Sequence, residues 1–289
     1  MNMDFKSAEE LLNLCEENQL PISEVMRQRE CLLGEVPRDS VNHRMGKAWE
    51  IMRSSATQPL KKPIKSMGGL IGGEAKKLEA HDAKNKSICG DVLEKAIIYA
   101  MAVLEVNASM GLIVAAPTAG SAGVVPGMML ALQECYRISD QRIVDALFHA
   151  GAVGYLAMRN ATVAGAVGGC QAEVGVASAM AAAVELMGGT PQQCLDAAST
   201  VLMNMLGLVC DPVGGLVEYP CQNRNAAGVA NALVAAEMSL SGIRQLIPFD
   251  QMLDTMYAVG KRLPAELRET AQGGCATTPA ACAACGLCG

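Results

Sequence analysis

Apolar residues recur at helical spacing along almost the whole chain, and this pattern predicts helices nearly throughout. Capping signals support several of the starts, such as Ser7 with Glu10 and Thr190 with Pro191 and Gln193. The predicted helices are one that follows Ser7, residues 21–33, one that follows 37–40 and carries Met45, Trp49 and Met52, and residues 91–110, 126–136, 139–159, 171–187, 190–208, 221–243 and 248–262.

Strand patterns are nearly absent, and residues 216–219 are the only weak candidate. The stretch 58–90 is polar and rich in Pro and Gly, and we predict no long element there. We therefore expect an all-α fold: one compact, Ala/Gly-rich helical catalytic domain over residues 1–279, with Gly/Pro-rich loops that form the active site. Residues 1–55 are a candidate for a small N-terminal helical element, and residues 280–289 form a Cys-rich tail.

The composition supports a large packed core. Hydrophobic residues make up 51% of the 289 and charged residues only 18%, so long disordered regions are excluded. Aromatic residues are 3%, while Gly and Ala abound, so helices can pack closely but bury less area per residue. We expect an oligomer for that reason. A net charge of −6 without a basic stripe argues against a nucleic-acid partner.

The longest uncharged run, residues 106–133, is long enough to span a bilayer. It contains Pro117, Pro126 and four glycines, so we expect a buried turn between two helices and no membrane contact. The first ten residues lack the apolar core of a secretory signal, which favours the cytoplasm. In that compartment, the twelve cysteines are expected to be reduced thiols or metal ligands.

Motifs for nucleotide or serine-hydrolase chemistry fail. Residues 68–73 have the outer glycine spacing of a phosphate-binding loop, but Glu74 and Ala75 stand where Lys and Ser or Thr are required. Residues 120–123 miss the nucleophile elbow by one residue. No lysine sits in a recognisable pyridoxal phosphate segment, and Lys76, the best candidate, is expected to be solvated.

Three cysteines stand out by their surroundings. Cys170 follows two glycines, and Cys210 and Cys221 bracket a Gly/Pro-rich segment. Free backbone N–H groups at such helix ends stabilise thiolates, and an iron–sulfur cluster requires thiolates. However, cysteine is also among the most buried residue types, and no C-x-x-C marks these positions. Spacing alone leaves both interpretations open.

Several segments of the chain resemble the alpha chain of the iron–sulfur-dependent, pyridoxal-independent bacterial L-serine dehydratases. The resemblance extends over about residues 5–279 and is most specific in 210–225. The matching segments are 66–78, 105–111, 116–127, 168–175, 205–225, 267–270 and 273–274. It implies a [4Fe–4S] cluster held by Cys170, Cys210 and Cys221.

The resemblance also implies β-elimination of L-serine to pyruvate and ammonia, in which an open cluster iron acts as a Lewis acid on the hydroxyl. Fixed donors must hold the substrate. The candidates, each of which has a turn-stabilising or capping role as its alternative, are Ser66, Gly68 in the 68–73 loop, Asn107, Thr118, Ser121, Arg224 and Asn225. Glu173 and Glu218 lie beside the candidate ligand cysteines in the sequence, and we expect them to support these ligands, with a direct role in catalysis as the alternative.

The general base is missing from this set. The family's Ser-His-Thr segment belongs to its β region and does not occur in this chain. His43, His81 and His149 lie outside the matched motifs and are expected to be ordinary surface or helix residues. The hypothesis therefore includes a separate β chain, in a heterodimer or larger assembly, that completes the site.

The tail departs from the expected pattern. Cys282, Cys285 and Cys288 form a C-x-x-C-x-x-C run after Cys275, which is typical of thiolate metal sites but lacks the fourth Cys-Pro. Three interpretations remain: a terminal cysteine, with Cys288 the candidate, is a fourth cluster ligand; the tail binds a second metal; or it is a flexible reduced tail. The remaining cysteines are interpreted as small apolar residues, namely Cys15, Cys31, Cys89, Cys135 and Cys194.

Two alternatives accompany the leading hypothesis. A related elimination, cysteine desulfidation, would use the same site. A non-enzymatic, thiol-rich metal-binding scaffold would depend on the tail cysteines and not on Cys170.

Overall fold

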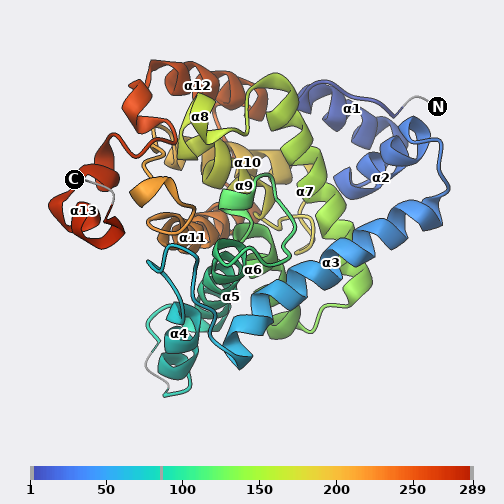
Figure 1. Ribbon diagram of the computed structural model, residues 1–289. Helices are drawn as coiled ribbons and strands as arrows, with labels where there is room; N and C mark the ends of the chain where they lie inside the picture. The colour runs from blue at the N-terminus through green and yellow to red at the C-terminus, as the bar shows by residue number, and fades with distance from the viewer. Residues whose placement is uncertain (1–2, 85–86, 287–289) are drawn as a thin grey trace.

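The computed structural model describes residues 3–84 and 87–286, and within these ranges it contains helices and no strand. The predicted all-α fold is confirmed. Figure 1 shows the arrangement of the helices. The α-helices are α1 Ala8–Asn18, α2 Ile22–Leu33, α3 Arg38–Lys61, α4 Glu74–Asp82, α5 Gly90–Ala108, α6 Val124–Tyr136, α7 Asp140–Asn160, α8 Gly165–Gly168, α9 Val176–Met180, α10 Pro191–Asn204, α11 Cys221–Leu240, α12 Phe249–Arg262 and α13 Pro279–Cys285. Shorter helical segments are η1 Ala119–Ser121, η2 Gln171–Gly175, η3 Val213–Gly215, η4 Ala265–Leu267 and η5 Gly274–Thr277.

Helices α5 and α6 lie side by side at the centre of the molecule, with α3 and α11 packed against α5 (Figure 1). Glycines set the distance between the central pair. A Cβ at Gly123 would lie 2.3 Å from the carbonyl oxygen of Ala100, and one at Gly127 would lie 2.8 Å from that of Ala96. Small residues therefore let these two backbones touch, as the composition led us to expect.

One continuous apolar core joins the N-terminal helices to the rest of the chain. Phe5, Ile22 and Trp49 are buried in the same cluster as Phe148 of α7 and Met252 of α12. The first 55 residues are thus packed on the domain, through α2 against α7 and α3 against α5.

Capping residues place several helix starts where the pattern predicted them. The Ser7 side chain accepts the Glu10 N–H, and Thr190 and Gln193 form a reciprocal capping box at the start of α10. The predictions for residues 171–187 and 216–219 are wrong. The first stretch is a π-helical turn followed by the short α9, and Ala183 then has a left-handed φ of 53°, which a helix cannot contain.

The proposed strand at 216–219 is an irregular segment after η3, where Gly214 and Gly215 have positive φ. The polar stretch 58–90 contains the end of α3 and all of α4. In the uncharged run, α5 ends at Ala108 and α6 begins at Val124; the turn between them is buried at residues 121–123 but exposed at 110–112. None of the described helices combines the length and the apolar character needed to cross a membrane.

Candidate active site

A cavity of about 280 Å³ lies where the loops between helices meet. It is lined by Thr118, Ala119 and Gly120 of the 116–123 turn, Ala164, Gly165, Glu173, Cys210, Pro212, Gly215, Val217, Cys221 and Glu269. Residues from six separate segments of the sequence therefore meet at one small space, and two of the three cysteines singled out by their surroundings are among them.

The three cysteines come from three different elements. Cys170 immediately precedes the π-helical turn, and Cys221 is the first residue of α11. Cys210 lies in an extended segment held to residues 267–269: its N–H donates to the Leu267 carbonyl at 2.9 Å, and its carbonyl accepts the Glu269 N–H at 2.7 Å. All three side chains are buried.

The three thiols influence one another. Interaction with the Cys210 thiol, together with the charge of the Arg224 guanidinium, lowers the pKa of Cys170, whereas the same interaction and burial raise the pKa of Cys210. Burial and the nearby Cys170 raise the pKa of Cys221 to about 12. The protein alone thus lowers the pKa of one thiol and raises the pKa of the other two, and a bound cationic centre would favour the thiolate form of all three. This donor set fits a thiolate-ligated cluster.

Arg224 is already engaged beside the thiols. Its Nη2 pairs with Asp211 Oδ1 at 2.6 Å, and its Nη1 donates to the Val209 carbonyl at 2.9 Å. The second Asp211 oxygen accepts the Cys275 N–H at 2.6 Å. The guanidinium therefore acts on the sulfur atoms through its charge, and Asp211 links it to the start of the C-terminal tail.

Glu173 is buried between the cavity and Cys210. Its Oε1 accepts a hydrogen bond from the Thr118 hydroxyl at 2.9 Å, and its Oε2 accepts one from the Cys210 thiol at 3.5 Å. Burial, with a contribution from the Glu269 carboxylate, raises the pKa of Glu173. Gly165 leaves this carboxyl room, because a Cβ there would lie 2.5 Å from Oε2 and 3.2 Å from Cys210 Sγ.

The loop that begins at Ser66 binds a carboxylate, but it is the side chain of Glu218 in the same chain and not that of a substrate. Ser66 Oγ and the N–H of Leu70 donate to Glu218 Oε2 at 2.6 and 2.9 Å, and the N–H of Gly68 donates to Oε1 at 2.6 Å. The predicted anion cradle thus exists and holds Glu218. The Ser66 hydroxyl and the Gly68 N–H therefore already donate to the Glu218 carboxylate.

The other predicted substrate-binding residues mostly hold the 116–123 turn in place. Asn225 donates to the carbonyls of Gly120 and Cys221 at 2.8 and 2.9 Å and accepts the Gly123 N–H at 3.0 Å. Asn107 donates to the Ala119 carbonyl at 3.1 Å, and Ser121 Oγ lies 3.0 Å from Thr118 Oγ1. Of the seven candidates, Thr118 is the one that lines the cavity.

Sequence reasoning did not identify Gly165 and Glu269 as cavity residues. Glu269 lies in the matched segment 267–270 and has a left-handed φ of 60°, but neither feature in the sequence indicates where it points. His43 and His81 are exposed on helices, as expected. The expectation for His149 holds only in part: the residue lies on a helix, α7, but its side chain is buried in the core. None of the three histidines lines the cavity.

The described part of the tail is a short helix docked on the domain. Helix α13 packs against η3, and the Thr278 hydroxyl caps its start by accepting the Ala281 N–H. The Cys282 thiol lies 3.9 Å from the Ala276 carbonyl, and Cys285 lies one turn later. Cys288, the candidate fourth ligand, lies outside the described residues.

Comparison with known proteins identifies the family of the chain. The serine dehydratase alpha chain family matches residues 17–276. The probable L-serine dehydratase, alpha chain, of Bacillus subtilis (strain 168) is 47% identical over 277 residues, which cover 95% of this chain and 92% of that protein. The L-serine dehydratase, alpha chain, of Peptoniphilus asaccharolyticus is 42% identical over 274 residues, 94% of each chain. The L-serine dehydratase TdcG of Escherichia coli (strain K12) is 36% identical over 94% of this chain but only 62% of its own length. The chain therefore belongs to the serine dehydratase alpha chain family.

Proposed function

We propose that this chain is the alpha subunit of an L-serine dehydratase, a lyase that converts L-serine to pyruvate and ammonia by β-elimination. We further propose that Cys170, Cys210 and Cys221 hold a [4Fe–4S] cluster. The observation that carries the proposal is the convergence of three buried thiols from three separate elements: Cys210 and Cys221 line one small cavity, and Cys170 interacts with Cys210 beside it. A volume near 280 Å³ is at the low end for ligand pockets and suits a small substrate.

When bound, such a cluster supplies a Lewis-acidic iron for the departing hydroxyl. The chain's own residues prepare the space around it. Arg224 favours ionised sulfur atoms at Cys170 and Cys221 through its charge. Glu173 orients the Thr118 hydroxyl at the cavity wall, and burial raises the pKa of its carboxyl.

Substrate binding is proposed to involve the cavity-facing backbone of Ala119 and Gly120, with Thr118. Asn107, Ser121 and Asn225 contribute indirectly, because their hydrogen bonds hold this turn in its conformation. Ser66 and Gly68 contribute by fixing Glu218, whose neighbour Val217 lines the cavity. Most of the predicted substrate contacts thus become positioning residues in this proposal.

We propose that a β chain supplies the base that removes the Cα proton. No histidine or lysine lines the described cavity. The L-serine dehydratases of E. coli and Helicobacter pylori extend well beyond the region that this chain matches, since it covers 62% of their length. Large apolar side chains next to the site are exposed, among them Met67, Met110 and Leu112, and would be covered by such a partner.

The free thiols of the described residues fit a reducing cytoplasm.

The test is anaerobic reconstitution of the chain with iron and sulfide, with and without a candidate β chain. Iron content, visible absorbance and pyruvate formation from L-serine are measured together. We expect Cys221→Ser to lose cluster absorbance and activity, and the matched Cys135→Ser, on the far end of α6, to keep both.

Full iron content in the Cys170→Ser, Cys210→Ser and Cys221→Ser variants would contradict the cluster assignment. Full turnover by the alpha chain without a β chain would contradict the partner assignment and leave the cluster intact. The same assay with L-cysteine in competition tests the alternative desulfidase function.

A further inference from the structure

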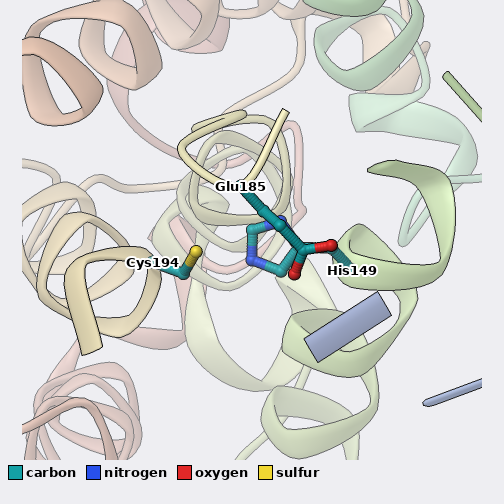
Figure 2. A group of neighbouring side chains, drawn as sticks. All are labelled: His149, Glu185 and Cys194. Atoms are coloured by element: carbon teal, nitrogen blue, oxygen red, sulfur yellow. The ribbon is translucent and has the colours of Figure 1, made fainter. Parts of the chain in front are cut away.

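A second group of ligand-type side chains lies outside the cavity. His149 of α7, Glu185 of the turn between α9 and α10, and Cys194 of α10 each place one donor atom within 4.8 Å of the other two. Figure 2 shows the imidazole of His149 and the thiol of Cys194 approaching from two helices, with the Glu185 carboxylate reaching in from the turn. None of the three lines the active-site cavity.

His149 is the residue that requires an explanation. It is 1% exposed, and neither ring nitrogen has a hydrogen-bond partner in the described structure. A neutral imidazole carries an unshared electron pair on one ring nitrogen, which can bind a metal ion. A buried polar group without a partner is costly, and such groups are rare in folded proteins. The unsatisfied nitrogen therefore points to a ligand that the chain itself does not supply.

The charges around His149 favour a cation as that ligand. Glu185 accepts the Ser23 N–H at 3.1 Å, and its carboxylate lies within 4.8 Å of the donor atoms of His149 and Cys194. Its negative charge acts on His149, Cys194 and Cys15, and no Lys or Arg contributes to the pKa of any of these three groups. A divalent ion would balance one carboxylate and one thiolate, and the whole group would then be neutral in the core.

We propose that His149, Glu185 and Cys194 bind a zinc ion. Imidazole nitrogen, thiolate sulfur and carboxylate oxygen are its usual ligands, whereas magnesium and calcium take all-oxygen sites. Cys15 of α1, which lies close enough to act on Cys194, is a candidate donor for a fourth position. The ion would join α7, α10 and the turn at Ala183, and it would anchor the N-terminal helices to them.

A nucleophilic Cys–His–Glu triad is the other chemistry that these residues suggest. It would require an accessible thiol that ionises readily. Cys194 is 1% exposed, and burial raises its pKa well above the usual value. The nearby cavity of about 760 Å³ is lined by Cys15, Thr190 and Pro191, but not by Cys194. That cavity offers a route for an ion to enter beside Cys15, while the three ligands themselves are closed to a substrate.

The site can be tested by its metal content, independently of catalysis. The chain is purified anaerobically, without chelators, from zinc-supplemented cells, and zinc and iron are quantified by mass spectrometry. We expect equimolar zinc in the unaltered chain and a loss of at least tenfold in Cys194→Ala and His149→Gln, with iron after reconstitution unchanged. Circular dichroism verifies that the variants are folded.

Two further measurements keep the proposal falsifiable if the variants unfold. Zinc-edge X-ray absorption of the unaltered chain should show one or two sulfur ligands with nitrogen or oxygen neighbours. A variant with Cys282, Cys285 and Cys288 all replaced by Ser should keep its zinc. The absence of stoichiometric zinc from the unaltered chain, its retention in folded Cys194→Ala, or its loss in the tail variant would each overturn the proposal.

Discussion

The two cysteine-containing sites of this protein use similar donor atoms in opposite settings. Cys170, Cys210 and Cys221 lie at helix ends and in a loop, two of them line a cavity, and the charge of Arg224 acts on Cys170 and Cys221. His149 and Cys194 lie within regular helices, and with Glu185 they form a group closed off by the core. An open ligand position permits chemistry on a substrate, whereas a closed site contributes to folding. Access therefore separates their proposed roles more clearly than donor type.

The backbone explains how the two settings arise. The cavity depends on residues that leave space or turn sharply, such as Gly165 and Gly120 in its wall. The closed group takes His149 and Cys194 from the regular helices α7 and α10, and only Glu185 from a turn. Substitutions in the turns that line the cavity should therefore affect the first site and spare the second.

The largest effect is expected from Asn225→Asp. The Asn225 amide donates to two carbonyl oxygens in a fully buried position, so one oxygen of a charged carboxylate there would face both carbonyl oxygens without a donor. We expect unfolding free energy to fall by about 3–5 kcal/mol, as measured by urea denaturation. Asn160→Asp, at an exposed position with a single hydrogen bond, is the matched control. Equal stability of the two variants would show that the 116–123 turn does not depend on this amide.

A smaller effect, confined to the cavity, is expected from Gly165→Ala. The added methyl group would meet both the Glu173 carboxyl and the Cys210 sulfur. We expect pyruvate formation to fall by about 100-fold, equivalent to roughly 2.7 kcal/mol of activation free energy. In Gly151→Ala, the new Cβ is 4.0 Å from the nearest atom, Met26 Cε, and activity should be unchanged. Zinc content should be equal in both, and a loss confined to Gly165→Ala would show that the two sites are coupled.

The next effect concerns the cradle around Glu218. In Glu218→Gln, an amide N–H₂ would replace one acceptor oxygen and oppose the donors of Ser66, Gly68 or Leu70. We expect the free energy of unfolding to fall by about 2 kcal/mol, and hydrogen exchange at the Gly68 and Leu70 amides to become faster. Glu237→Gln, on the exposed face of α11, should change neither quantity. Unaltered exchange in Glu218→Gln would mean that the loop is held by other contacts.

The smallest effect is expected at the start of α10. Thr190→Ala removes the hydroxyl that accepts the Gln193 N–H. The free energy of unfolding, measured by thermal denaturation, should therefore fall by about 1 kcal/mol. Because Cys194 lies one turn further along, zinc content and active-site iron should both be retained. Loss of zinc in this variant would show that the closed site depends on the cap as well as on the core.

The sequence predicted the helices best where a local signal marks the boundary, as at Ser7 and Thr190. It failed at residues 171–187, because the π-helical turn and the left-handed Ala183 are imposed by packing and not by local preference. The same limit applies to the sites. Glycine-rich motifs located Cys170, Cys210 and Cys221, but Glu218 meets Gly68 across 150 positions of sequence, and no periodicity predicts that contact. His149, Glu185 and Cys194 likewise come together only in three dimensions.

The contact between α5 and α6 has a consequence for the variation that this protein can tolerate. At Gly123 and Gly127, any side chain would run into backbone carbonyl oxygens, which cannot move aside as a flexible side chain can. A saturation-mutagenesis library should therefore be depleted of every substitution at these two positions, while Gly46, which has no atom within 4 Å of its Cβ site, accepts many. Interiors built from the smallest residues leave evolution few neutral steps, since nothing can be made smaller and almost nothing larger fits.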